Sequence, residues 1–195
     1  MQPRIPRQPP RDQAAPGPHD VPRLGAEAAA ALAAARRRAA RDGDPQVDTA
    51  HLLHSLLEHD PQVRAAFDDG APRLARLLGY LVQRSIGYGL RWRSAVEDCG
   101  PALAVTVVEP SGATAVEGLS PLAAAAVERA CEESARHAGA PARGVGLLAA
   151  MLADPGARAA EVLAHAGIDV DALRARIEDG LHGREECLEG GSSAC

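Results

Sequence analysis

The sequence predicts an all-α fold of two pseudo-symmetric four-helix repeats, about eight helices in total, with an irregular segment between the repeats. Three observations support this prediction. Hydrophobic residues make up 46% of the 195 residues but aromatic residues only 2%, so the core must consist mainly of alanine, leucine and valine. Leucines recur at the spacing of an amphipathic helix. The order of helices and breaks in the first half then returns in the second half.

A tail precedes the first repeat, which we place at residues 24–84. Residues 1–23 contain seven prolines and four arginines. Such a segment cannot continue a helix and has little apolar surface to bury, so we expect it to be disordered.

The first two helices of this repeat have clear ends. Residues 25–42 are almost all strong helix formers, and Gly43 follows as a C-cap. Asp48 or Thr49 can cap the next helix, which runs to about residue 59 and carries a buried leucine face.

Two shorter segments complete the first repeat. Asp60-Pro61 ends the second helix and begins a short third helix that ends near Phe67, because proline suits the first turn of a helix. Residues 72–84 form a fourth helix, whose inward face carries four leucines, Leu74, Leu77, Leu78 and Leu81.

Residues 85–118 differ from both repeats and form an inter-repeat linker. The stretch 102–108 is rich in β-forming residues and lies between prolines, so it predicts one short strand, a hairpin or an extended loop. The only tryptophan and both tyrosines lie in or beside this linker.

The second repeat occupies residues 119–183 and follows the same order. Ser120-Pro121 begins the first helix of this repeat. Asp154-Pro155 separates its second helix from its third, and Gly167 ends the third helix. Adding 95 to Leu52, Leu53, Leu56 and Leu57 gives Leu147, Leu148, Met151 and Leu152. Residues 184–195 are polar and glycine-rich at their end, and we expect a flexible C-terminal tail there.

Composition also limits the function. A net charge of −5 argues against a general nucleic-acid-binding protein. The chain has no lysine, which excludes a lysine Schiff base and a Walker phosphate loop. It shows no C-x-x-C pair, no apolar signal core and no stretch near the ~18–20 apolar residues that span a bilayer. We therefore expect a cytoplasmic protein with reduced thiols and no membrane partner.

Three histidines lie near one another in the second helix. His51 and His54 are one turn apart, but no H-E-x-x-H arrangement follows, so we expect no metal site. A local hydrogen bond for His51 and solvated side chains for His54 and His59 are the simpler expectation. The arginines Arg36–Arg38 and Arg41 predict a solvated helix face, with an acidic partner patch as the alternative.

Each half resembles the N-terminal repeat of Clp-type unfoldase ATPases, whose second helix begins near a Gly-Thr-Glu-His signature. Here Asp48-Thr49-Ala50-His51 stands at that place, with Ala50 instead of the glutamate. In the second repeat Val145 takes the glutamate position, and only the apolar frame remains. Leu24 and Leu119 replace the aromatic residue that the family places before each first helix.

The resemblance implies a platform that docks substrates or adaptors, with a protein or peptide ligand and possibly a Clp ATPase or its client as partner. The ligand-contacting positions carried over from it are Leu24, Thr49, His51 and Leu119. Phosphoarginine recognition, known in some members, needs the acidic residues that Ala50 and Val145 replace. We expect a stand-alone module without ATPase motifs, catalytic residues or cofactors, acting as adaptor, decoy or regulator of Clp-dependent proteolysis. The alternatives are a transcription-linked regulator and a biosynthetic enzyme recruited onto this scaffold.

Overall fold

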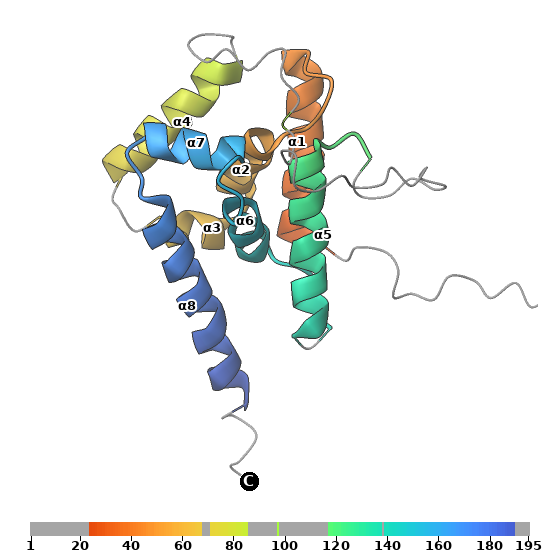
Figure 1. The fold of residues 1–195 in the computed structure, drawn as a ribbon, viewed down its shortest axis with the longest axis vertical. Helices are drawn as coiled ribbons and strands as arrows, with labels where there is room; N and C mark the ends of the chain where they lie inside the picture. The colour runs from red at the N-terminus through yellow and green to blue at the C-terminus, as the bar shows by residue number, and fades with distance from the viewer. Residues whose placement is uncertain (1–23, 68–70, 86–96, 98–116, 138, 190–195) are drawn as a thin grey trace, which may run out of the picture.

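The protein is all-α in a computed structural model that describes residues 24–67, 71–85, 97, 117–137 and 139–189. Eight helices lie within these residues, and no strand does (Figure 1). The first four are α1 (Ala26–Asp42), α2 (Thr49–His59), α3 (Pro61–Ala66) and α4 (Ala71–Ser85). The second four are α5 (Pro121–Arg136), α6 (Gly144–Leu152), α7 (Arg158–His165) and α8 (Val170–Glu189). The prediction of an all-α fold is confirmed.

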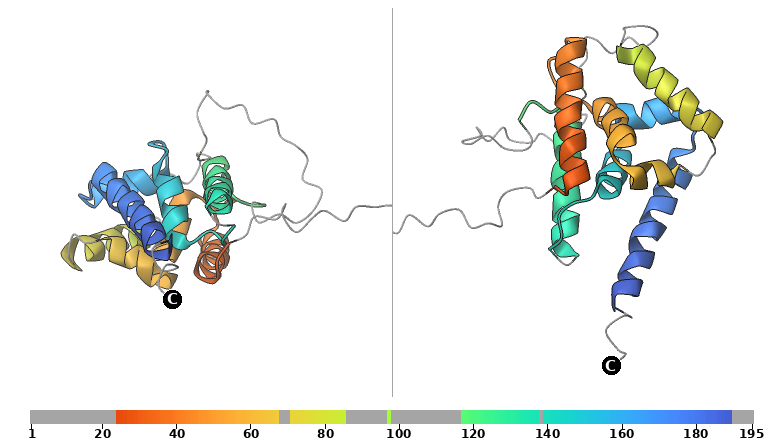
Figure 2. Two further views of the ribbon diagram at one scale, coloured as in Figure 1. Left: turned by 90° about the horizontal axis from the view of Figure 1, so that it is seen from below. Right: turned by 180° about the vertical axis from the view of Figure 1, so that it is seen from behind.

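Helices α2 and α6 form the centre of the molecule, and the other helices surround them (Figures 1 and 2). Their leucines are completely buried: Leu52, Leu53, Leu56, Leu147 and Leu148. Helix α1 packs on α2 as α5 packs on α6, and α3 packs on α6 as α7 packs on α2. These contacts within and between the repeats therefore occur in matched pairs.

Two short backbone pairings between the repeats follow the same symmetry. Leu24 pairs with Ala142, and Val47 pairs with Leu119, each in parallel. The Gly25 amide donates to the Ala142 carbonyl at 2.8 Å, and the Ser120 amide donates to the Val47 carbonyl at 2.8 Å. The predicted shift of 95 converts Leu24 into Leu119 and Val47 into Ala142, so it exchanges one pairing for the other. The two halves are thus related by a pseudo-twofold.

The predicted helix ends are mostly correct. Gly43 ends α1 with a left-handed φ of 74°, a conformation that glycine adopts without strain. Asp48 caps α2, Ser120 caps α5 with Pro121 in its first turn, and Asp60 caps α3. Asp154 behaves differently, because its carboxylate accepts from the Gly156 amide in a turn and α7 begins only at Arg158.

The predicted C-terminal boundary is wrong. Helix α8 continues to Glu189, beyond the predicted end of the second repeat at residue 183. Residues 184–189 are mainly helix formers, and the helix reaches them before the paired glycines at 190 and 191. Its C-terminal end points away from the other helices (Figure 2). The predicted tail at 1–23 and the β-rich stretch at 102–108 lie outside the described residues.

Candidate functional site

The two repeats meet where several helices begin, and one carboxylate from the linker lies buried among them. Glu97 is only 4% exposed. Its Oε2 accepts from the Thr49 amide at 2.9 Å and from the Ser120 hydroxyl at 2.7 Å. Its Oε1 accepts from the Arg158 amide at 2.7 Å and from the Thr49 hydroxyl. We call Thr49, Glu97, Ser120 and Arg158 the junction cluster; its donors come from the starts of α2, α5 and α7.

The two hydroxyls of the junction cluster are oriented as donors. The Ala159 amide donates to Thr49 Oγ1 at 3.0 Å, and the Ala123 amide donates to Ser120 Oγ at 3.2 Å. A hydroxyl that accepts from an amide can still donate its own hydrogen. Each hydroxyl can therefore donate its own hydrogen to a Glu97 oxygen.

Asp48 connects the junction cluster to the start of α2. Its Oδ2 lies 2.6 Å from the Arg158 guanidinium, and its Oδ1 accepts from the His51 amide at 2.9 Å. His51 Nδ1 accepts in return from the Asp48 amide at 3.2 Å, which completes a reciprocal capping box. The local hydrogen bond predicted for His51 is confirmed.

The other edge of the His51 ring faces the end of α1. His51 is completely buried, and its Nε2 lies 3.1 Å from Asp44 Oδ2 and 3.9 Å from Asp42 Oδ2. The ring therefore joins the C-terminal end of α1 to the N-terminal end of α2. Within the part of the chain that the structure describes, no group of three or more His, Cys, Asp or Glu residues has an arrangement that could hold a metal ion.

The prediction that His54 is solvated is wrong. The side chain is 4% exposed, and its Nε2 lies 3.4 Å from Glu58 Oε1. Burial, followed by the nearby charge of Arg38, lowers the pKa of His54 to about 4. The ring is therefore neutral at pH 7. His59 is exposed, as predicted.

Among the described residues, the pseudo-twofold does not generate a second copy of the junction cluster. The shift of 95 places Gly144 where the first repeat has Thr49. An added Cβ at Gly144 would lie 2.1 Å from Asp60 Oδ2, so a side chain at this position would displace that carboxylate. Asp60 is buried and caps α3 through the Gln62 amide at 2.8 Å. The pseudo-twofold therefore breaks down at the polar positions.

The residues predicted to contact a ligand lie in the interior of the protein, near the junction of the repeats. Thr49 and Leu119 are buried, His51 is completely buried, and Leu24 is partly buried. Thr49 and His51 use their side chains in internal hydrogen bonds. Ala50, at the position of the lost glutamate, is completely buried as well. No observation tests whether these residues contact a ligand, so that assignment stays a prediction.

The most important polar residue of the site, Glu97, was not predicted. It belongs to the linker, and its partners lie 23 to 61 positions away in the sequence. The linker contains four acidic residues, Glu97, Asp98, Glu109 and Glu117, and no spacing rule distinguishes the one that becomes buried.

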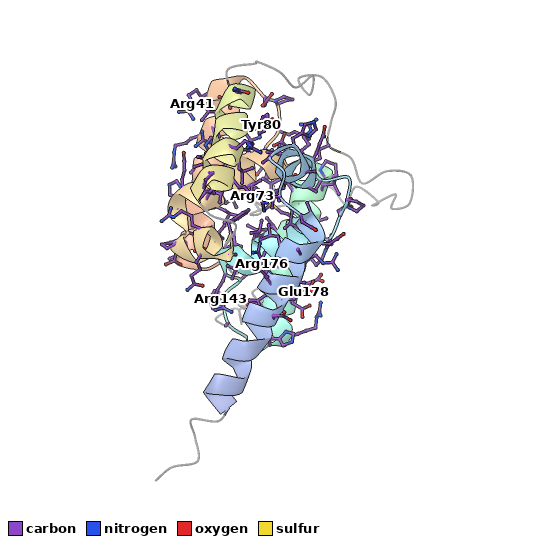
Figure 3. The ribbon with its side chains drawn as sticks, turned by 90° about the vertical axis from the view of Figure 1, so that its left-hand side faces the viewer. Arg41, Arg73, Tyr80, Arg143, Arg176 and Glu178 are labelled. Atoms are coloured by element: carbon purple, nitrogen blue, oxygen red, sulfur yellow. The ribbon has the colours of Figure 1, made fainter. Side chains whose placement is uncertain are left out.

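The surface of the described segments exposes few large hydrophobic side chains. In the described segments, Val82 on α4 is the exposed large hydrophobic side chain, at 50% exposure. Figure 3 shows the side formed by α4 and α8, which displays the arginines Arg73, Arg143 and Arg176. Arg36, Arg37 and Arg41 are exposed on α1, whereas Arg38 pairs with Glu58 at 2.7 Å. None of the described helices is long and apolar enough to span a membrane.

Comparison with solved structures identifies the architecture. The N-terminal domain of the caseinolytic protease associated chaperone ClpD from Arabidopsis thaliana superposes with a TM-score of 0.56. The match covers 85% of this chain and 99% of that domain, at 20% sequence identity. This chain has a Clp N-domain-like fold. No protein-family model and no curated protein matches the sequence. Because the identity is low, the comparison establishes the Clp N-domain-like fold alone.

Proposed function

We propose that this protein is a Clp N-domain-like binding module that docks a protein or peptide, and that it acts as an adaptor, decoy or regulator of Clp-dependent proteolysis. The observation that carries the proposal is the match to the ClpD N-terminal domain over nearly the whole of that domain. Fold likeness is an analogy for function, so the site must supply its own support.

The junction cluster supports binding more than catalysis. Thr49 and Ser120 are each 1% exposed, and each hydroxyl is hydrogen-bonded both to Glu97 and to a backbone amide. A hydroxyl held in this way cannot reach a substrate without breaking the contacts that join α2, α5 and α7. The cluster instead holds the two repeats in one arrangement, which suits a rigid docking platform.

The surface indicates how a partner would bind. In the described part of the chain, Val82 is the single large hydrophobic side chain that is exposed. Docking would therefore depend on polar and charged contacts. Such contacts between exposed charges weaken as salt screens them. We therefore expect association to weaken between low and high ionic strength.

A reconstituted degradation assay tests the proposal. A Clp ATPase, its protease and a model substrate from the source organism are mixed with increasing amounts of the full chain. An adaptor raises the degradation rate of its client, and a decoy lowers the rate for a shared substrate. If the native chain changes no substrate's degradation rate and captures no Clp ATPase, protease or client at low salt, the proposal is wrong.

A further inference from the structure

The Glu97 carboxylate is bound as a ligand would be. Among the described residues two donors reach each oxygen, and these four come from other segments: the Thr49 amide and hydroxyl, the Ser120 hydroxyl and the Arg158 amide. Thr49 and Ser120 are buried polar side chains, so the donors are preformed and shielded from water. Their convergence on a single planar group is the signature of a carboxylate site.

The donors around the Glu97 carboxylate suit a ligand that carries a single negative charge. The starts of α2 and α7 direct backbone amides at the carboxylate, and helix N-termini favour anions. The Arg158 guanidinium is 2.6 Å from Asp48, so its charge is balanced there. The remaining donors are neutral, and two donors for each of two oxygens match a carboxylate better than a phosphate dianion.

We propose that the junction of the repeats is a carboxylate-binding site that the chain fills with its own Glu97. While Glu97 is bound, external carboxylates are excluded. When its side chain is shortened, a small carboxylate takes its place and restores the contacts. This proposal does not depend on Clp-dependent docking, and the two can fail separately.

The test removes the internal ligand and supplies an external one. Glu97→Ala leaves the space of one carbon and one carboxylate, which acetate fills. We expect Glu97→Ala to lower the melting temperature by about 5–10 °C in a chain of this size. Acetate on the order of 0.1 M, a concentration suited to so small a ligand, should recover at least half of that loss, and the melting temperature should rise with the logarithm of the acetate concentration once the site is filled.

Three controls isolate the carboxylate. Acetamide has the same shape without the charge, and sodium chloride matches the ionic strength; neither should recover stability. The wild-type chain and Glu97→Gln should gain no more stability from acetate than from sodium chloride, because their own side chains occupy the site. Inorganic phosphate should recover less than acetate, and equal or greater recovery by phosphate would overturn the assignment to carboxylates.

The proposal stays testable if Glu97→Ala fails to fold. That variant is then refolded by dialysis into acetate or into acetamide, and folding is followed by circular dichroism. Acetate-dependent folding supports the site. Equal folding in both, failure in both, or an unchanged melting temperature for Glu97→Ala overturns it.

Discussion

Protonation of His54 should weaken the fold in a defined pH range. Its pKa lies at about 4 in the folded protein and near 6.5 in the unfolded chain. As pH falls, the unfolded chain takes up the proton first, so the contribution of His54 to stability is complete above pH 6.5 and is lost toward pH 4. The full shift corresponds to about 3 kcal/mol at pH 4. Because solvent screens the part of the shift that comes from the charge of Arg38, we expect a loss of about 2 kcal/mol.

The assay is urea denaturation of the wild type and of His54→Gln at several pH values from 7 to 4. The difference between the two free energies of unfolding removes the contribution of the other titrating groups that both proteins share. As the pH falls from 7 to 4, the wild type should lose about 2 kcal/mol of stability relative to His54→Gln. A difference independent of pH, or an NMR titration that gives His54 a pKa near 6.5, would refute the reasoning.

Three further predictions concern packing, the junction cluster and the thiol. Gly144→Ala should destabilise the protein by about 1–3 kcal/mol because its Cβ would lie 2.1 Å from Asp60 Oδ2, and an equally stable variant would contradict the packing. Its control, Gly146→Ala, meets no atom within 4 Å and should be neutral or stabilising by up to about 1 kcal/mol. Thr49→Val should cost about 1–3 kcal/mol in urea denaturation because it leaves buried partners unsatisfied, whereas Thr49→Ser should keep most of that stability. Burial and then the charge of Glu128 raise the pKa of the Cys131 thiol, so its alkylation at pH 8, mapped by mass spectrometry, should be slower than that of glutathione.

The fold was predictable because its signals are local. Caps such as Asp48, Asp60 and Ser120 stand directly before the helices that they begin, and the leucine faces of α2 and α6 have helical spacing. The internal duplication was predictable because the same apolar frame returns after 95 positions. The pseudo-twofold pairing of Leu24 with Ala142 and of Val47 with Leu119 agrees with that shift.

The site was less predictable because its contacts are distant in sequence. The pairing of Arg158 with Asp48 spans 110 positions, and Glu97 enters from a segment with no periodic pattern. His54 was expected to be solvated because histidine at a helix surface usually is, yet the packing of α1 over α2 covers it. Tertiary packing, rather than local preference, decides such positions.

Amide hydrogen exchange tests the central claim, that the two repeats close around a buried Glu97. Amides in the first turn of a helix have no partner in that helix and normally exchange fast. Here the amides of Thr49 and Arg158 donate to Glu97, and the Ser120 amide donates across the repeats to Val47. We predict that all three are protected as strongly as the core of α2, and that Glu97→Ala removes protection from Thr49 and Arg158 while Ser120 keeps it. Fast exchange of Thr49 and Arg158 in the wild-type protein would contradict the account.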